Sequence, residues 1–170
     1  MSRKKHAHDA GGTPATLLLD ADGAEYGTHA YAHDPQAPSY GAEAAEALGV
    51  DPARVFKTLL IDTGRPGSEA LAVAVVPVTG SLDLKAAAMA LHVKKVHLAQ
   101  AADAQRRTGY VLGGISPLGQ RHPSTTVLDD SALDWPTIHV SGGRRGLEIE
   151  LAPQDLIRLT GARPVPLAGP

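Results

Sequence analysis

The sequence predicts a single-domain α+β fold: a compact, mixed and largely antiparallel barrel-like sheet with flanking helices. Strand-like segments come in turn-linked pairs, and single helices interrupt them without the regular strand–helix alternation of a doubly wound fold. No internal repeat or linker divides the chain. Its 170 residues, 43% of them hydrophobic, are enough to bury the core of one domain.

Turn and cap residues place the elements of the N-terminal half. Thr13-Pro14 is typical of a helix start, and Gly23 ends that helix. Arg65-Pro66-Gly67 is a turn that joins two apolar strands into a hairpin. The elements expected here are a helix from 13 to 23, a strand at 26–31, a loop at 33–38, a helix at 43–48, a strand at 55–61 and a strand at 70–76.

The C-terminal half follows the same logic, with Pro153 at a helix start and Gly161 at its end. The elements expected are a helix that follows Ser81-Leu82-Asp83 and runs to about 91, a strand at 96–98, a helix at 101–107, strands at 125–128, 137–140 and 147–151, and a helix at 153–159. The domain should span 13–161, between a flexible N-terminal tail at 1–12 and an irregular, proline-containing C-terminal tail at 162–170.

Composition and charge exclude several classes of protein. The absence of cysteine excludes disulfides, thiolate metal sites and a cysteine nucleophile, and it fits a cytoplasmic protein. No apolar run approaches membrane-spanning length, so we expect no membrane contact. The net charge of −2 lacks the basic surplus of a dedicated nucleic-acid binder, so any RNA contact should be local, weak or assisted by a partner.

Three segments can carry chemistry. Lys57 stands in an otherwise apolar strand, where it either faces solvent or needs a partner or ligand, because an unpaired buried charge costs several kcal/mol. The loop at 113–119 has two adjacent glycines, whose N–H groups can approach a carbonyl oxygen or an oxyanion. The turn at 140–146 contains Ser141 and two arginines. Taken alone, each of these three segments is also compatible with an ordinary loop or turn, or with a solvent-exposed strand face.

We expect neither a metal nor a cofactor. His29 and His33 are possible metal ligands, but no third ligand is evident from the sequence. No histidine and carboxylate pair has a spacing that makes Ser141 a triad nucleophile.

The order of these segments resembles the YbaK/EbsC family, with its bacterial YbaK branch as the nearest match. The resemblance covers about 13–161, and its specific part is the thirteen-residue stretch at the glycine loop. The segments that carry it are Thr13-Pro14-Ala15, His33-Asp34-Pro35, Val55-Phe56-Lys57-Thr58-Leu59-Leu60, 108–120 and 140–147.

This resemblance implies a YbaK-like fold and an aminoacyl-tRNA deacylase that hydrolyses cysteine mischarged on tRNA(Pro), in transient complex with prolyl-tRNA synthetase. It implies catalytic roles for Lys57, Gly113 and Gly114, with Lys57 anchoring the ester or the terminal adenosine. The substrate-binding residues that it implies are Tyr31, Tyr40, Phe56, Ser116, Pro117, Ser141 and Gly142. Tyr40 departs from the family, which usually has Phe there.

The resemblance also implies that the substrate's own thiol attacks its ester, because the chain has no cysteine and no obvious general base. The enzyme then has to bind, orient and stabilise charge. Three alternatives remain: a deacylase for alanyl-tRNA(Pro) or another misacylated tRNA, a non-catalytic aminoacyl-tRNA or synthetase-binding module, and a lysine Schiff-base enzyme at Lys57.

Overall fold

The computed structural model describes residues 12–37 and 39–169. Within these ranges the helices are α1 (Pro14–Asp22), α2 (Tyr40–Leu48), α3 (Leu84–Ala90), α4 (Ala101–Thr108) and α5 (Pro153–Thr160), with short 3₁₀ turns at Pro52–Arg54, Gly67–Glu69 and Asp130–Asp134. The strands are β1 (Tyr26–Ala30), β2 (Phe56–Asp62), β3 (Leu71–Pro77), β4 (Ser81–Leu82), β5 (His97–Leu98), β6 (Thr126–Asp129), β7 (Ile138–Ser141), β8 (Leu147–Leu151), β9 (Arg163–Val165) and β10 (Ala168–Gly169).

The strands form three sheets. The largest has the order β5-β2-β3-β6-β9, the second β1-β8-β7, and β10 pairs with β4. Most pairs are antiparallel, but β6 runs parallel to both β3 and β9. An isolated parallel bridge between Val55 and His139 brings β2 beside β7 and so joins the two larger sheets. The predicted α+β class and the mixed, largely antiparallel pairing are therefore confirmed, although the sheets do not close into a barrel.

The main core lies between the two larger sheets. Side chains alternate along a strand, and in β2 the even-numbered residues Phe56 and Leu60 point into this core. Ile138 and Val140 of β7 and Ile149 of β8 meet them from the other sheet. The odd-numbered positions of β2 and β7, together with the even-numbered ones of β8, consequently lie on the faces turned away from this core.

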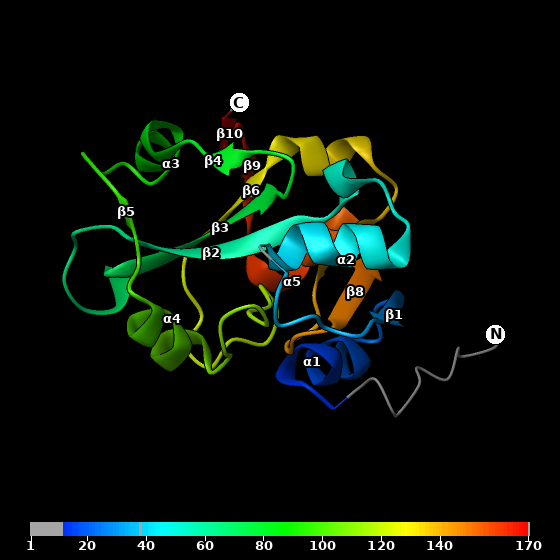
Figure 1. Cartoon of the computed structure of the whole chain (residues 1–170). Coiled ribbons are helices and arrows are strands. Elements are labelled where there is room, and N and C mark those ends of the chain that lie inside the picture. The colour runs from blue at the N-terminus through cyan, green and yellow to red at the C-terminus, as the bar shows by residue number, and fades with distance from the viewer. Residues whose placement is uncertain (1–11, 38, 170) are drawn as a thin grey trace.

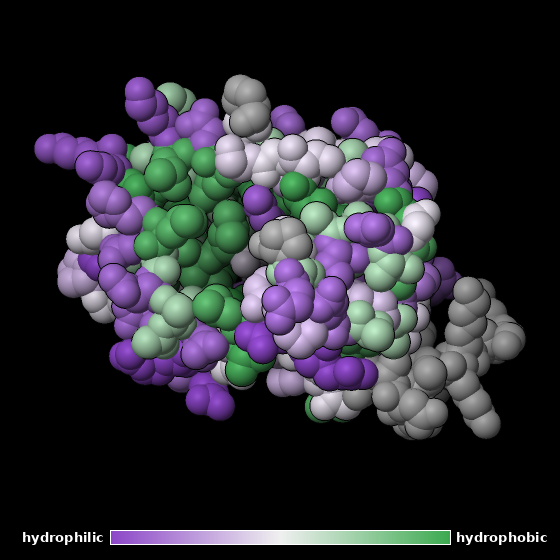
Figure 2. Space-filling view, in the orientation of Figure 1, coloured by the Kyte–Doolittle hydropathy of each residue, from purple (hydrophilic) through white to green (hydrophobic). Residues whose placement is uncertain are grey.

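Helices cover these outer faces. Ala87 and Ala88 of α3 pack with Ile61 of β2, while Ala44 and Ala45 of α2 pack with Val55 at the start of the same strand. Figure 1 shows α2 in front of the middle of the molecule and α3 above the left part of β2. Between them, Figure 2 shows a hollowed apolar area, which lies over β2 and β3. Lys57 and Leu59 belong to this outer face of β2.

The start of α1 follows directly from its cap residues. Thr13 is the N-cap, and its hydroxyl accepts a hydrogen bond from the N–H of Thr16 at 3.2 Å. Pro14 occupies the first turn, where no backbone donor is needed, and Gly23 ends the helix in the left-handed region at φ 80°. The helix predicted from Thr13 to Gly23 is confirmed.

The prediction of an irregular C-terminal tail is wrong for residues 163–169. β9 pairs in parallel with β6, and β10 pairs with β4. Pro164 is compatible with β9 because that strand lies at the edge of its sheet, where a missing N–H need not leave a neighbouring strand unpaired. The N-terminal tail predicted at 1–12 lies outside the described residues except for Gly12.

Candidate functional site

Lys57 lies on the outer face of β2 and is half-buried. Its side chain has no hydrogen bond or ion pair with any residue that the structure describes. Val55, two residues earlier on the same face, bridges to His139 in the parallel strand β7. Continuing that register by two residues brings Lys57 alongside Ser141. The ammonium group is therefore available to a ligand that reaches this face.

Glu148 of β8 stands directly opposite Ser141 in the antiparallel ladder. Opposed residues have Cβ atoms about 5 Å apart, so the hydroxyl and the carboxyl groups are neighbours on the outer face. Glu148 is only 7% exposed, and its Oε2 has no hydrogen-bond partner in the described part of the chain. Burial raises the pKa of Glu148 to about 8. A buried carboxyl group with unused hydrogen-bonding capacity is a mark of a functional site.

Tyr31 joins the same group of residues from the end of β1. Its N–H donates to Gly146 O at 2.9 Å, which ties it to the turn between β7 and β8. Burial raises the pKa of Tyr31 to about 12, and the nearby Glu148 and Glu43 add to the effect while a backbone hydrogen bond from Gly146 opposes it. The phenol is therefore neutral, and its hydroxyl can donate a hydrogen bond.

The glycine loop packs against the turn that follows β7. A Cβ on Gly114 would lie 2.8 Å from Arg144 Cα and 2.9 Å from Arg144 C, closer than carbon atoms approach without repulsion. A Cβ on Gly113 would lie 2.6 Å from Cε1 of the Tyr40 ring. Both positions therefore need glycine because other parts of the chain occupy the space. This contact places the two glycine-containing segments side by side.

The expectation for one of the two oxyanion donors is wrong. The N–H of Gly114 donates to Val111 O at 2.9 Å, so a turn within the loop already uses it. The N–H of Gly113 has no partner in the described part of the chain, and this residue has φ +82°, a conformation that favours glycine. Of the two glycines, Gly113 is the one that can donate to a substrate.

The aromatic ring of Tyr40 packs against one side of the glycine loop. It lies 5.5 Å from the His33 ring and 5.4 Å from the Arg145 guanidinium, measured to the Tyr40 ring centroid. Arg145 also donates through Nε to Leu112 O at 2.8 Å. Both Arg144 and Arg145 are exposed, but Arg145 also contacts the glycine loop.

Other predicted site residues have structural roles. Phe56 is 2% exposed and packs in the main core, so it points away from Lys57. Ser116 is fully buried, and its Oγ accepts from Leu118 N at 3.2 Å. Pro117 is buried in the same loop. Gly142 is buried, and its carbonyl accepts from the Thr13 hydroxyl at 2.5 Å. The structure does not bring Phe56 into the site, and the other three shape its walls.

Two buried side chains hold the walls in place. Thr13, at the start of α1, binds the turn after β7 through Gly142. Tyr110 donates through its hydroxyl to Leu118 O at 2.6 Å, and a Cβ on Gly143 would lie 2.9 Å from its ring. The start of α1, the glycine loop and the Ser141 turn are therefore fixed to one another.

Glu148 is the residue that sequence reasoning missed. The signal was present in Leu147-Glu148-Ile149-Glu150-Leu151, where two carboxylates alternate with core residues and must share one face of the strand. By itself, this alternation is typical of an ordinary half-exposed strand. Burial of Glu148 depends on contacts with segments far away in the sequence, which the local pattern does not reveal.

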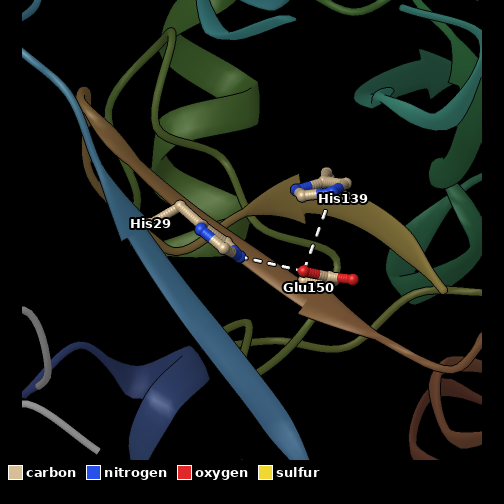
Figure 3. A group of neighbouring side chains, drawn as sticks. All are labelled: His29, His139 and Glu150. Carbon is tan, nitrogen blue, oxygen red and sulfur yellow. Dashed lines mark hydrogen bonds and ion pairs between the residues drawn. The ribbon is translucent and has the colours of Figure 1, made fainter. Parts of the chain in front are cut away.

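The metal-ligand reasoning also needs correction. His33 Nδ1 is 2.8 Å from Glu43 Oε1 and does not join His29. Instead, His29 lies with His139 and Glu150 in a group whose ligand atoms are all within 4.8 Å of one another (Figure 3). The structure therefore gathers three potential ligands at His29, a grouping that the sequence did not reveal.

None of the helices in the described part of the chain is both long and apolar enough to cross a membrane.

Comparison with known proteins gives a consistent result. A family model described as "Aminoacyl-tRNA editing domain" matches residues 34–159. A protein of Enterococcus faecalis named "Putative Cys-tRNA(Pro)/Cys-tRNA(Cys) deacylase EbsC" is 40% identical over 119 residues, which is 70% of this chain and 71% of that protein.

Solved structures share the fold over most of the chain. One described as "a putative trans-editing enzyme for prolyl tRNA synthetase" has a TM-score of 0.80 at 22% identity and covers 92% of this chain and 96% of its own. Another, described as "hypothetical protein APE2540", has a TM-score of 0.79 at 25% identity and covers 92% of this chain and 99% of its own.

Proposed function

Because the chain belongs to the family of aminoacyl-tRNA editing domains, we propose that it is a deacylase that hydrolyses the ester of cysteine mischarged on tRNA(Pro). The Enterococcus faecalis relative carries that activity in its name, including cysteinyl-tRNA(Cys) as a second substrate. Since cysteine and proline differ little in size, a trans-acting hydrolase of this kind would correct an error that a synthetase pocket distinguishes poorly.

One observation carries the assignment of the site: the glycine loop packs directly on the turn that follows Ser141. The Gly114 position leaves no room for a Cβ beside Arg144. Lys57 lies on the same outer face as Ser141 without a partner in the described structure. A cation, a free N–H at Gly113 and a hydroxyl group therefore border one region, which is the minimum needed to hold an ester and stabilise an oxyanion.

The residues can be given distinct roles. Gly113 N–H would donate to the developing oxyanion, and Lys57 would add positive charge beside the reacting ester or the terminal adenosine. Ser141 and Tyr31 would position the aminoacyl end, with the Glu148 carboxyl group next to Ser141. The apolar hollow over β2, to which Leu59 contributes on the Lys57 side, would receive the adenine base.

The chemistry would begin with the substrate. The cysteine sulfur forms a bond to its own carbonyl carbon, the ester C–O bond to the ribose breaks, and the thiol proton ends on the ribose oxygen. Water then opens the resulting thioester. This route requires positioning and charge stabilisation more than activation of an external nucleophile, which suits a site built from Lys57 and backbone N–H groups.

A panel of charged tRNAs tests the proposal. Purified protein should deacylate cysteinyl-tRNA(Pro) and leave alanyl-tRNA(Pro) largely intact. If alanyl-tRNA(Pro) is hydrolysed as fast, the substrate assignment fails and the alanyl deacylase is preferred. If charged tRNA binds but no ester is cleaved, the non-catalytic module is preferred.

The proposed function implies two binding partners, tRNA(Pro) and prolyl-tRNA synthetase. With a net charge of −2, the chain should bind tRNA weakly, through local patches such as Lys94-Lys95, Arg106-Arg107 and the exposed Arg144. A transient complex with prolyl-tRNA synthetase, in the cytoplasm, would bring the substrate to it. Co-purification with the synthetase in the presence of tRNA(Pro) checks this, and its absence at low and moderate salt would contradict it.

A further inference from the structure

Three potential metal ligands meet on the sheet formed by β1, β8 and β7, beside the proposed site. His29 comes from β1, His139 from β7 and Glu150 from β8, and Figure 3 shows their side chains turned toward one another. His29 Nε2 is 2.9 Å from Glu150 Oε1, and His139 Nε2 is 4.0 Å from the same oxygen. The imidazole rings are 5.3 Å apart, centroid to centroid.

His139 is the independent sign of a ligand. Its side chain is 2% exposed, so water scarcely reaches it. Nδ1 has no hydrogen-bond partner in the described part of the chain, and the separation of Nε2 from Glu150 is too long for a hydrogen bond. The described structure therefore gives this buried ring no side-chain hydrogen bond, and an ion at Nε2 would be a strong partner for it.

We propose that His29 Nε2, His139 Nε2 and Glu150 Oε1 bind one Zn²⁺ ion. Ligands about 2.0–2.1 Å from a tetrahedral ion are about 3.3 Å from one another. The separations of 2.9 and 4.0 Å, with all ligand atoms within 4.8 Å, come within small side-chain rotations of that geometry. Two imidazoles and a carboxylate favour Zn²⁺ over Mg²⁺ or Ca²⁺, which prefer oxygen ligands alone.

The surroundings of Glu150 support its role as a ligand. Its second oxygen, Oε2, accepts from Thr137 Oγ1 at 2.5 Å and lies 3.4 Å from an Arg54 guanidinium nitrogen. Arg54 is itself held by Thr137 O at 3.1 and 3.0 Å and lies over the Trp135 ring. Thr137 and Arg54 therefore hold the carboxylate through Oε2 and leave Oε1 for the ion. Metal ligands are commonly oriented by such hydrogen-bonding neighbours.

The ion would have a structural role. It would crosslink β1, β7 and β8 two residues away from Ser141 and Glu148, and would fix the strands that carry them. His29 has 38% of its side chain exposed, which leaves an open side for entry of the ion and for a water as fourth ligand. This site does not depend on the proposed deacylase activity, and its test uses no activity measurement.

The experiment is a Zn²⁺ titration of the full chain against a chromophoric chelator. His6 and His8 near the N-terminus can also bind metal, so the parent for all measurements carries His6→Ala and His8→Ala. We expect one bound Zn²⁺ per chain in this parent, and a His29→Ala change should weaken binding at least about tenfold. His97→Ala, which removes an exposed strand histidine outside the group, is the matched control and should bind like the parent.

Two further readouts separate binding from unfolding. Zn²⁺ should raise the Tm of the parent and of His97→Ala but not that of His29→Ala, while all three have similar Tm values without metal. In ¹⁵N NMR spectra, Zn²⁺ should shift the imidazole nitrogens of His29 and His139. No stoichiometric binding in the parent, or binding that His29→Ala leaves unchanged, would overturn the proposal and leave a hydrogen-bonded His29–Glu150 pair.

Discussion

At the scale of single residues, Lys57 is the cation on which the proposed chemistry depends. Replacing it with alanine should lower kcat for cysteinyl-tRNA(Pro) by about 100- to 1000-fold, the usual effect of losing one preorganised electrostatic group in a transition state. The fold should survive because the Lys57 side chain makes no hydrogen bond or ion pair in the described structure. Single-turnover deacylation and a thermal melt measure the two effects.

Lys85→Ala provides the matched control for Lys57, since it removes an exposed lysine at the start of α3. It should leave the rate unchanged. Turnover by Lys57→Ala within about threefold of the parent would remove Lys57 from the mechanism.

Tyr40 separates the contribution of a ring from that of a hydroxyl. Its ring fills the space beside Gly113 and lies near Arg145, while its hydroxyl makes no hydrogen bond with any described residue. Tyr40→Phe should therefore keep kcat/KM within about twofold, and Tyr40→Ala should lower it by about tenfold as the loop loses its support. Equal losses in both variants would show instead that the hydroxyl contacts the substrate.

At the scale of elements, the contact between the glycine loop and the Ser141 turn holds the site together. Gly114 does not have a positive φ, so alanine is not strained there by its own backbone. The obstacle is the Arg144 backbone, 2.8 Å from the added Cβ. Gly114→Ala should cost about 1–3 kcal/mol in the free energy of unfolding and at least tenfold in activity.

Gly169→Ala is the control for this prediction, because its Cβ would meet neighbours at an ordinary 3.7–3.8 Å. Chemical denaturation of both variants gives the difference in unfolding free energy. A Gly114→Ala protein as stable and active as Gly169→Ala would mean that the two segments do not need to approach so closely.

Asp129, at the end of β6, attaches the C-terminal strands. Its Oδ1 accepts from Leu167 N at 2.8 Å and Ala168 N at 2.9 Å. Burial acts to raise its pKa, but the hydrogen bonds from Ser131 and then from these two N–H groups outweigh burial and lower it. A lowered pKa in the folded state means that the ionised form stabilises the fold.

The contribution of Asp129 should therefore be present above its unfolded pKa of about 3.9 and be lost as the pH falls through the lower, folded value. Asp129→Asn should cost about 1–3 kcal/mol near neutral pH and flatten the fall in stability below pH 4. Urea denaturation across pH 2.5–7 measures both. A variant with the parent's acid dependence would show that other carboxyl groups cause it.

At the scale of the whole molecule, local patterns predicted the elements well and their long-range partners poorly. All five helices of the described ranges were predicted, several of them from proline, glycine or hydroxyl caps, and the Arg65-Pro66-Gly67 turn correctly predicted the β2–β3 hairpin. The strands β4, β9 and β10 were missed because each has only two or three residues, and β9 contains a proline that fits only at a sheet edge.

For the candidate site, too, the sequence indicated individual residues but not their long-range partners. Lys57, Gly113 and Ser141 were identified from their motifs, and the fold brings their segments together. What sequence cannot specify is which backbone groups are already used, as with Gly114 N–H and Val111 O. Nor does it show which side chains meet across strands, and for that reason the His29–His139–Glu150 group and the burial of Glu148 emerged only from the structure.

The most direct measurement compares tRNA(Pro) charged with cysteine and with serine, which differ by sulfur against oxygen at nearly the same size. If the site positions a substrate that supplies its own nucleophile, the seryl ester should be cleaved at least tenfold more slowly under single-turnover conditions, because a hydroxyl group is a far weaker nucleophile than a thiol. Equal rates for the two esters would contradict the account, since a site that activates water would not distinguish them.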